Sequence, residues 1–100
     1  MQSTNRDPSG TSFFETTFRA TVNDIIAICG QPAMEHNDGA DKINFEWILE
    51  TESNKLFTVY DWKLRRPIKK DEELEWHIGG HTKEATEEAL AELQQALKNK

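Results

Sequence analysis

The chain has little of what would identify a disulfide-stapled or membrane-bound protein. It contains one cysteine, Cys29, so it cannot form an internal disulfide or a zinc module built on several cysteines. No apolar run approaches the ~20 residues that a membrane-spanning helix needs, and residues 1–10 lack the apolar stretch of a signal peptide. We therefore expect a cytoplasmic protein without membrane contact.

Positive charge and catalytic motifs are also scarce. Lys and Arg number 12 and Asp and Glu number 18, which gives a net charge of -6 at pH 7. This excess of negative charge disfavours general binding to duplex nucleic acid, which depends on neutralising phosphates. Because GxSxG, HExxH and paired-carboxylate motifs are all missing, the sequence predicts a protein that is not an enzyme and holds no cofactor.

The composition that remains is that of a folded domain. Hydrophobic residues make up 36% and aromatic residues 9% of the chain, which is richer in Trp and Phe than disordered proteins are. A length of 100 residues suffices for one hydrophobic core and hardly for two. We expect residues 1–10, which are polar and without periodicity, to form a disordered leader, and residues 11–100 to form a single α+β domain.

Apolar periodicity predicts the elements of that domain. Alternating patterns indicate strands at 11–19, 43–49, 56–64 and 74–78, with a loop at 31–42. Apolar residues at helical spacing follow Thr21 and Thr82, which are suited to cap two helices. The order β-α-β-β-β-α predicts a two-layer sandwich in which two helices cover an antiparallel sheet of three to four strands. We expect the strand at 56–64 to be central, because both of its faces carry bulky side chains.

A glycine pair, Gly79 and Gly80, is expected to end the last strand just before the final helix. Glycines let the backbone turn with its amides exposed, and a helix start offers free N–H groups, so together they attract phosphate or carboxylate. Thr82 and Lys83 would add a hydroxyl and a cation to this anion site. The plainer interpretation is that the glycines only join the strand to the helix and that Thr82 is only a cap.

A cluster of bases follows two aromatic residues, Tyr60 and Trp62. Five of the 12 basic residues fall within eight positions: Lys63, Arg65, Arg66, Lys69 and Lys70. Cations beside stacking surfaces suit a nucleotide or a single strand of nucleic acid. Alternatively, the acidic residues within 71–75 neutralise these bases and leave an ordinary solvated loop.

Two histidines, His77 and His81, lie four positions apart, a spacing that zinc-binding helices use. The two glycines between them argue against a continuous helix, so we expect no metal site there. A hydrolase built around this histidine pair is the weaker alternative function.

Within residues 57–81 the segments FTVYDWK, RP and EWHIGGH follow one another. Their order and spacing resemble a pattern in small uncharacterised proteins of tailed bacteriophages. The resemblance implies a phage protein that acts in the cytoplasm of the host cell. By analogy with small phage proteins, it also implies a counter-defence role, through inhibition of host defence or sequestration of its nucleotide signals.

These features predict a binding protein for a small anionic, nucleotide-like ligand. In this interpretation the aromatic residues stack on the ligand, the bases supply charge and the diglycine segment supplies backbone amides. The candidate binding residues are Tyr60, Trp62, Lys63, Arg65, Arg66, Trp76, His77, Gly79, Gly80, Thr82 and Lys83. The interpretation requires that Trp62, Arg66 and Gly80 converge in space.

The alternative function is that of an acidic inhibitor that occupies a host protein or mimics nucleic acid. Its surface would be supplied by Glu46, Glu50, Glu52, Glu84, Glu87, Glu88 and Glu92. An acidic face also keeps many small proteins soluble without binding a partner. For either function we expect a symmetric homodimer, because two helices would leave apolar area of the sheet uncovered.

Overall fold

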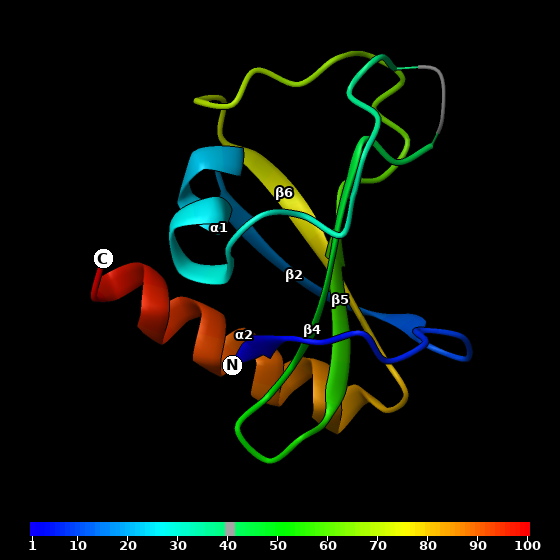
Figure 1. The fold of residues 1–100 in the computed structure, drawn as a ribbon, viewed down its shortest axis with the longest axis vertical. Coiled ribbons are helices and arrows are strands. Elements are labelled where there is room, and N and C mark those ends of the chain that lie inside the picture. The colour runs from blue at the N-terminus through cyan, green and yellow to red at the C-terminus, as the bar shows by residue number, and fades with distance from the viewer. Residues whose placement is uncertain (40–41) are drawn as a thin grey trace.

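The computed structural model describes residues 1–39 and 42–100, which form six strands and two helices (Figure 1). The strands are β1 (Gln2–Ser3), β2 (Ser12–Ala20), β3 (Met34–Glu35), β4 (Phe45–Glu50), β5 (Leu56–Tyr60) and β6 (Leu74–Gly80). Their order across the sheet is β1-β4-β5-β6-β2, and β3 also pairs with β4. All of these pairings are antiparallel. The predicted α+β class, the antiparallel sheet with two helices and the central position of β5 are therefore confirmed.

The predicted number of strands, three to four, is wrong, because the described residues form a sheet of six. The two additional strands, β1 and β3, contain two residues each, which is too short for an alternating pattern to reveal them. β1 lies within residues 1–10, for which the sequence predicts a disordered leader. β3 lies within the predicted loop at 31–42, of which residues 40 and 41 are outside the described part of the chain.

Helix α1 (Val22–Cys29) begins directly after the predicted Thr21 cap. The Thr21 hydroxyl accepts a hydrogen bond from the Asp24 N–H at 3.0 Å, and the Asp24 carboxylate accepts one from the Thr21 N–H at 3.1 Å. These two bonds form a complete capping box. Gly30 ends the helix with φ at +84°, a conformation that glycine adopts without strain.

Helix α2 (Lys83–Lys98) starts after the predicted Thr82 cap and packs on β2, β5 and β6. The core lies between the two helices and one face of the sheet (Figure 1). Large side chains on that face are almost fully buried: Phe18, Phe45, Trp47, Leu49, Phe57, Val59, Leu74, Trp76 and Ile78. Within the described residues, neither helix has the length and apolar character that crossing a membrane requires.

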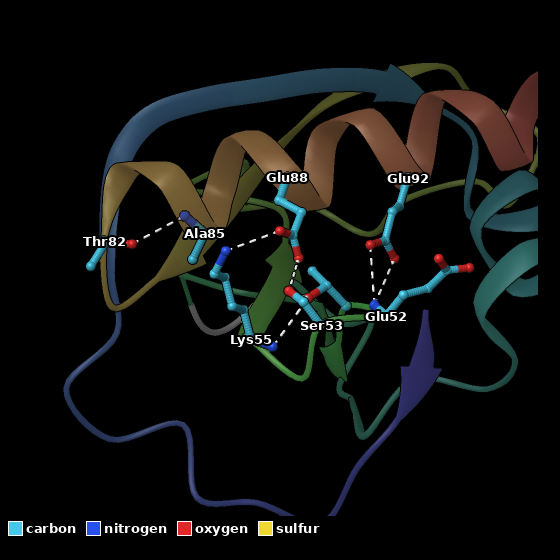
Figure 2. A network of polar contacts seen from close by, with 8 residues as sticks. Glu52, Ser53, Lys55, Thr82, Ala85, Glu88 and Glu92 are labelled. Carbon is cyan, nitrogen blue, oxygen red and sulfur yellow. Dashed lines mark hydrogen bonds and ion pairs between the residues drawn. The ribbon is translucent and has the colours of Figure 1, made fainter.

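The hairpin between β4 and β5 is tied to helix α2 by two glutamates (Figure 2). Glu88 accepts hydrogen bonds from Ser53 Oγ and, at 3.0 Å, from Lys55 Nζ. The Glu92 carboxylate accepts a hydrogen bond from the backbone N–H of Glu52, with 3.1 Å to the nearer oxygen. Polar contacts therefore join the turn of the sheet to the helical layer.

Strands β5 and β6 differ from their predicted lengths. β5 ends at Tyr60 instead of residue 64, because the carboxylate of Asp61 turns inward and accepts hydrogen bonds from the backbone N–H groups of residues 44–45. β6 runs two residues beyond its predicted end and includes Gly79 and Gly80, which pair with both β5 and β2. The glycines are thus part of the sheet ladder and not of a turn after it.

Candidate functional site

The sheet face opposite to the helices carries the candidate site. Glu46, Tyr60 and His77 point to this face, because side chains alternate along a strand and the residues before and after each of them are buried. The strand register places them in one row: Glu46 pairs with Tyr60, Tyr60 with His77, and His77 with Thr17. Four neighbouring strands therefore bring four side chains side by side.

Three aromatic rings surround His77 on this face, and we call the four rings the aromatic platform: Phe13, Tyr60, Trp62 and His77. Phe13 stacks on His77, with ring centroids 3.9 Å apart and planes 4° apart. Tyr60 meets His77 edge-on at 5.5 Å, and the Trp62 centroid lies 6.3 Å from that of His77. Phe13 is 39% exposed and Trp62 40% exposed, although both are large apolar side chains. The platform is therefore a solvent-facing stacking surface.

Residues 4–11 cover the other end of this face. They connect β1, on the outer edge of β4, to β2, on the outer edge of β6, and therefore cross the sheet. Arg6 Nη1 donates hydrogen bonds to Glu50 Oε2 at 3.2 Å and to the Asn54 carbonyl at 2.8 Å. These contacts place the crossing near the β4–β5 hairpin (Figure 1). The aromatic platform lies toward the opposite end of β5, where its outer rings remain exposed.

Gly79 leaves room for the platform. In the ladder it lies between Thr58 of β5 and Phe13 of β2. A Cβ at position 79 would lie 2.6 Å from Thr58 Oγ1 and 3.5 Å from the Tyr60 ring. The missing side chain therefore avoids a clash with Thr58 Oγ1 beside the Tyr60 ring.

Two lysines bring positive charge to the platform. Lys42 Nζ lies 5.8 Å and Lys63 Nζ 5.5 Å from the centre of the Trp62 ring, both within cation–π distance. The Lys63 N–H donates a hydrogen bond to the Lys42 carbonyl at 2.8 Å, which joins the two loops that carry these side chains. An aromatic surface beside two ammonium groups is suited to a flat ligand that carries negative charge.

A buried polar network holds these two loops in place. Asn44 Nδ2 donates to Asp61 Oδ2 at 3.1 Å and to the Arg66 carbonyl at 3.0 Å. The Asn44 and Asp61 side chains are both completely buried. Asn37 adds two hydrogen bonds to the backbone of Ile68, at 2.8 and 2.6 Å. The positions of the lysines therefore depend on a satisfied internal network.

Partial burial perturbs the titration of the groups at the platform. Desolvation lowers the pKa of His77, opposed by the negative charge of Glu75, and therefore favours the neutral imidazole at pH 7. Desolvation raises the pKa of Tyr60, and the charge of Glu46 raises it further. The pKa of Glu46 is itself raised by desolvation. Polar groups at this site are thus partly shielded from water and interact more strongly with one another than they would at an open surface.

The structure brings together four of the predicted binding residues, namely Tyr60, Trp62, Lys63 and His77. Arg65 and Arg66 are exposed in the loop that follows, and the Arg66 guanidinium is ion-paired with Glu72. Arg66 therefore has a carboxylate partner already, whereas Lys42 and Lys63 form no described ion pair.

Trp76 lies on the opposite face of the sheet from the platform. Its side chain is completely buried, meets Trp47 edge-on at 5.6 Å and donates a hydrogen bond from Nε1 to the Ala20 carbonyl at 2.9 Å. It is therefore a core residue, and no surface ligand can stack on it.

The diglycine segment is also separate from the platform lysines. Gly80 is buried and pairs with Phe57, at the hairpin end of β5. The Thr82 hydroxyl accepts a hydrogen bond from the Ala85 N–H at 3.1 Å, and Lys83 is exposed on the first turn of α2. The structure therefore does not place Gly80 beside Trp62 and Arg66, and the amides of the glycine pair do not form an open anion nest.

Sequence reasoning missed Phe13 and Lys42, and it assigned Glu46 to the acidic surface of the alternative function instead. For Phe13 a signal existed, since Phe14, Thr16 and Phe18 fall on one side of the strand at period two and leave Phe13 on the other. Its approach to His77 also depends on a register shift between Phe13 and Thr17, and no sequence pattern reveals that shift. Lys42 reaches Trp62 only through the pairing of two loops, which periodicity does not detect.

No three His, Cys, Asp or Glu side chains in the described ranges gather closely enough to hold a metal ion. The chain matches no protein-family model, no curated protein and no solved structure.

Proposed function

We propose that the protein is a non-enzymatic binding protein that holds a nucleotide on the aromatic platform. The observation that carries the proposal is that three rings contact His77 on the uncovered end of the sheet, with two ammonium groups beside the most exposed ring. The nucleobase stacks on Trp62, and the phosphate lies toward Lys42 and Lys63. Because residues 57–81 resemble a phage pattern, we propose that the protein sequesters a nucleotide signal of host defence.

Two general properties of such surfaces support this ligand class. Exposed aromatic side chains on an open antiparallel sheet stack on unpaired bases, at about 1–3 kcal/mol per base. The net charge of -6 repels phosphates from most of the surface. Attraction is therefore local to the two lysines, and we expect the affinity to fall as salt screens them.

The proposal is tested by titrating the protein with the four common ribonucleoside monophosphates. Trp47 and Trp76 are buried in the core, so a change in tryptophan emission reports on Trp62. We expect quenching on binding and a loss of affinity of about tenfold or more in Trp62→Ala, measured by calorimetry. A Lys42→Gln, Lys63→Gln variant should also bind more weakly and lose most of the salt dependence.

The matched control is Lys69→Gln, Lys70→Gln, which removes the same charge from exposed positions of the loop after β5. We expect this variant to bind as the unaltered protein does. Full affinity in Trp62→Ala, or equal loss in both lysine pairs, would contradict the proposed placement of the ligand.

The acidic-inhibitor alternative is less well supported. Of the glutamates on helix α2, Glu88 and Glu92 already accept hydrogen bonds from the β4–β5 hairpin (Figure 2). Their charge is therefore partly used within the molecule, and the face that remains for a basic partner is smaller than the sequence suggests.

A further inference from the structure

Glu46 occupies an unusual position beside the platform. It lies on β4 directly opposite Tyr60 and in the same cross-strand row as His77. Its side chain is half-buried, and no described residue donates a hydrogen bond to its carboxylate or forms an ion pair with it. Glu50, four residues further along the same strand and on the same face, instead accepts hydrogen bonds from Gln2 at 2.7 Å and from Arg6 at 3.2 Å.

A partly desolvated carboxylate without a protein partner loses part of its contact with water and gains no hydrogen bond in exchange. Burial raises the pKa of Glu46, which is the expected consequence of that cost. Hydrogen bonds to a charged acceptor are stronger than neutral ones. A ligand that supplies N–H donors at this point would therefore recover what the free protein lacks.

We propose that the Glu46 carboxylate reads the edge of the stacked base and selects guanine, an inference that rests on the proposed nucleotide-binding function. In this placement the polar edge of the base points toward the neighbouring strand β4, on which Glu46 lies opposite Tyr60. The Watson–Crick edge of guanine presents two adjacent donors, N1–H and the 2-amino group, which match the two oxygens of one carboxylate. Adenine and cytosine each present one amino donor beside an acceptor nitrogen, and uracil presents one N–H between two carbonyls.

The charges of the site agree with this orientation. The two lysines lie beyond the end of β5 at Trp62, whereas Glu46 lies to the side of Tyr60 on β4. A guanine nucleotide likewise carries its negative phosphate and its donor edge at different ends. The site is therefore positive where the phosphate would lie and negative where the base donors would lie.

The test compares guanosine, inosine and adenosine monophosphates by calorimetry at neutral pH. Inosine lacks only the 2-amino group, so it isolates the second donor. We expect the guanine nucleotide to bind about tenfold or more tightly than the adenine nucleotide, with the inosine nucleotide between them. Glu46→Gln should bring the guanine nucleotide to the affinity of the adenine nucleotide and change the latter by less than about twofold.

Glu50→Gln is the matched control, since it makes the same change on the same strand and face but at a carboxylate that has partners. It should keep the preference for guanine. Equal binding of guanine and adenine nucleotides that both require Trp62 would overturn this inference and leave the proposed function intact. If no nucleotide binds, the proposed function fails and this inference fails with it. An equal loss of affinity for all three nucleotides in Glu46→Gln would also overturn this inference. If Glu46→Gln does not fold, the preference of the unaltered protein for guanine over adenine serves as the test.

Discussion

Asp61 is a completely buried carboxylate that joins the two loops behind the platform. It accepts hydrogen bonds from the backbone N–H groups of Asn44 and Phe45, at 2.9 and 2.8 Å, and from the Asn44 side chain at 3.1 Å. Asn44 in turn donates to the Arg66 carbonyl. One side chain thus satisfies three donors that are shut off from water.

Asp61→Ala should destabilise the protein by about 3 kcal/mol, because the substitution leaves several buried donors without an acceptor. The measurement is urea unfolding followed by tryptophan emission. Asp71→Ala, which removes an exposed carboxylate from the loop before β6, is the control and should change the stability by less than about 0.5 kcal/mol. A cost below about 1 kcal/mol for Asp61→Ala would show that the loops do not depend on this network.

Strand β6 has no room for a side chain at Gly79. A Cβ there would lie 2.6 Å from Thr58 Oγ1, closer than two such atoms approach without something moving. Gly79→Ala should therefore destabilise the protein by about 1–3 kcal/mol and weaken nucleotide binding, since the displaced Thr58 adjoins the Tyr60 ring.

Thr58→Ala removes the atom that the new methyl group would meet, so it serves as a suppressor. In a double-mutant cycle by urea unfolding, the combined variant should be more stable than the sum of the single effects predicts, by about 1 kcal/mol or more. Additive effects would mean that the cost of Gly79→Ala does not come from the contact between the new methyl group and Thr58 Oγ1.

At the scale of the elements, the sequence predicts best where one signal is long or chemically specific. The alternation in β4 and the Thr21 and Thr82 caps locate a strand and the starts of both helices, because each depends on residues near in sequence. β1 and β3 escape detection because two residues carry no period. β5 ends early because Asp61 finds its donors 16 and 17 residues away, and no local pattern contains that information.

The candidate site divides in the same way. Tyr60, Trp62 and Lys63 are neighbours in sequence, so a search along the chain finds them together. The sequence assigns Trp76 to the site, although Trp76 shares the apolar side of its strand with the core residues Leu74 and Ile78. Glu46 and Phe13 join only through the register of four strands, which the sequence does not specify.

In the molecule as a whole, polar contacts at the β4–β5 hairpin join the layer of strands to the layer of helices, in addition to the hydrophobic core between them (Figure 2). The pKa of Glu88 is lowered to about 2 by hydrogen bonds from Ser53 and Thr51 and by its contact with Lys55. A carboxyl group whose pKa is lowered in the folded state stabilises the fold above its ordinary value of 4.5. That contribution is lost as the pH falls from there toward about 2.

Glu88→Gln should therefore lower the urea midpoint at pH 7, and the difference from the unaltered protein should shrink as the pH falls below 4.5 and vanish near pH 2. Glu87→Gln makes the same change at the preceding, exposed position and should leave the midpoint nearly unchanged at every pH. Amide exchange at residues 51–55 should be faster in Glu88→Gln, because Glu88 contacts the β4–β5 hairpin and not the platform. A constant difference between pH 2 and pH 7 would assign the loss to packing of the side chain instead of its charge. Because the hairpin lies at the covered end of the sheet, away from the platform, we expect both variants to bind the nucleotide with the same affinity at pH 7. A change in stability without a change in affinity would show that Glu88 joins the two layers and takes no part in binding.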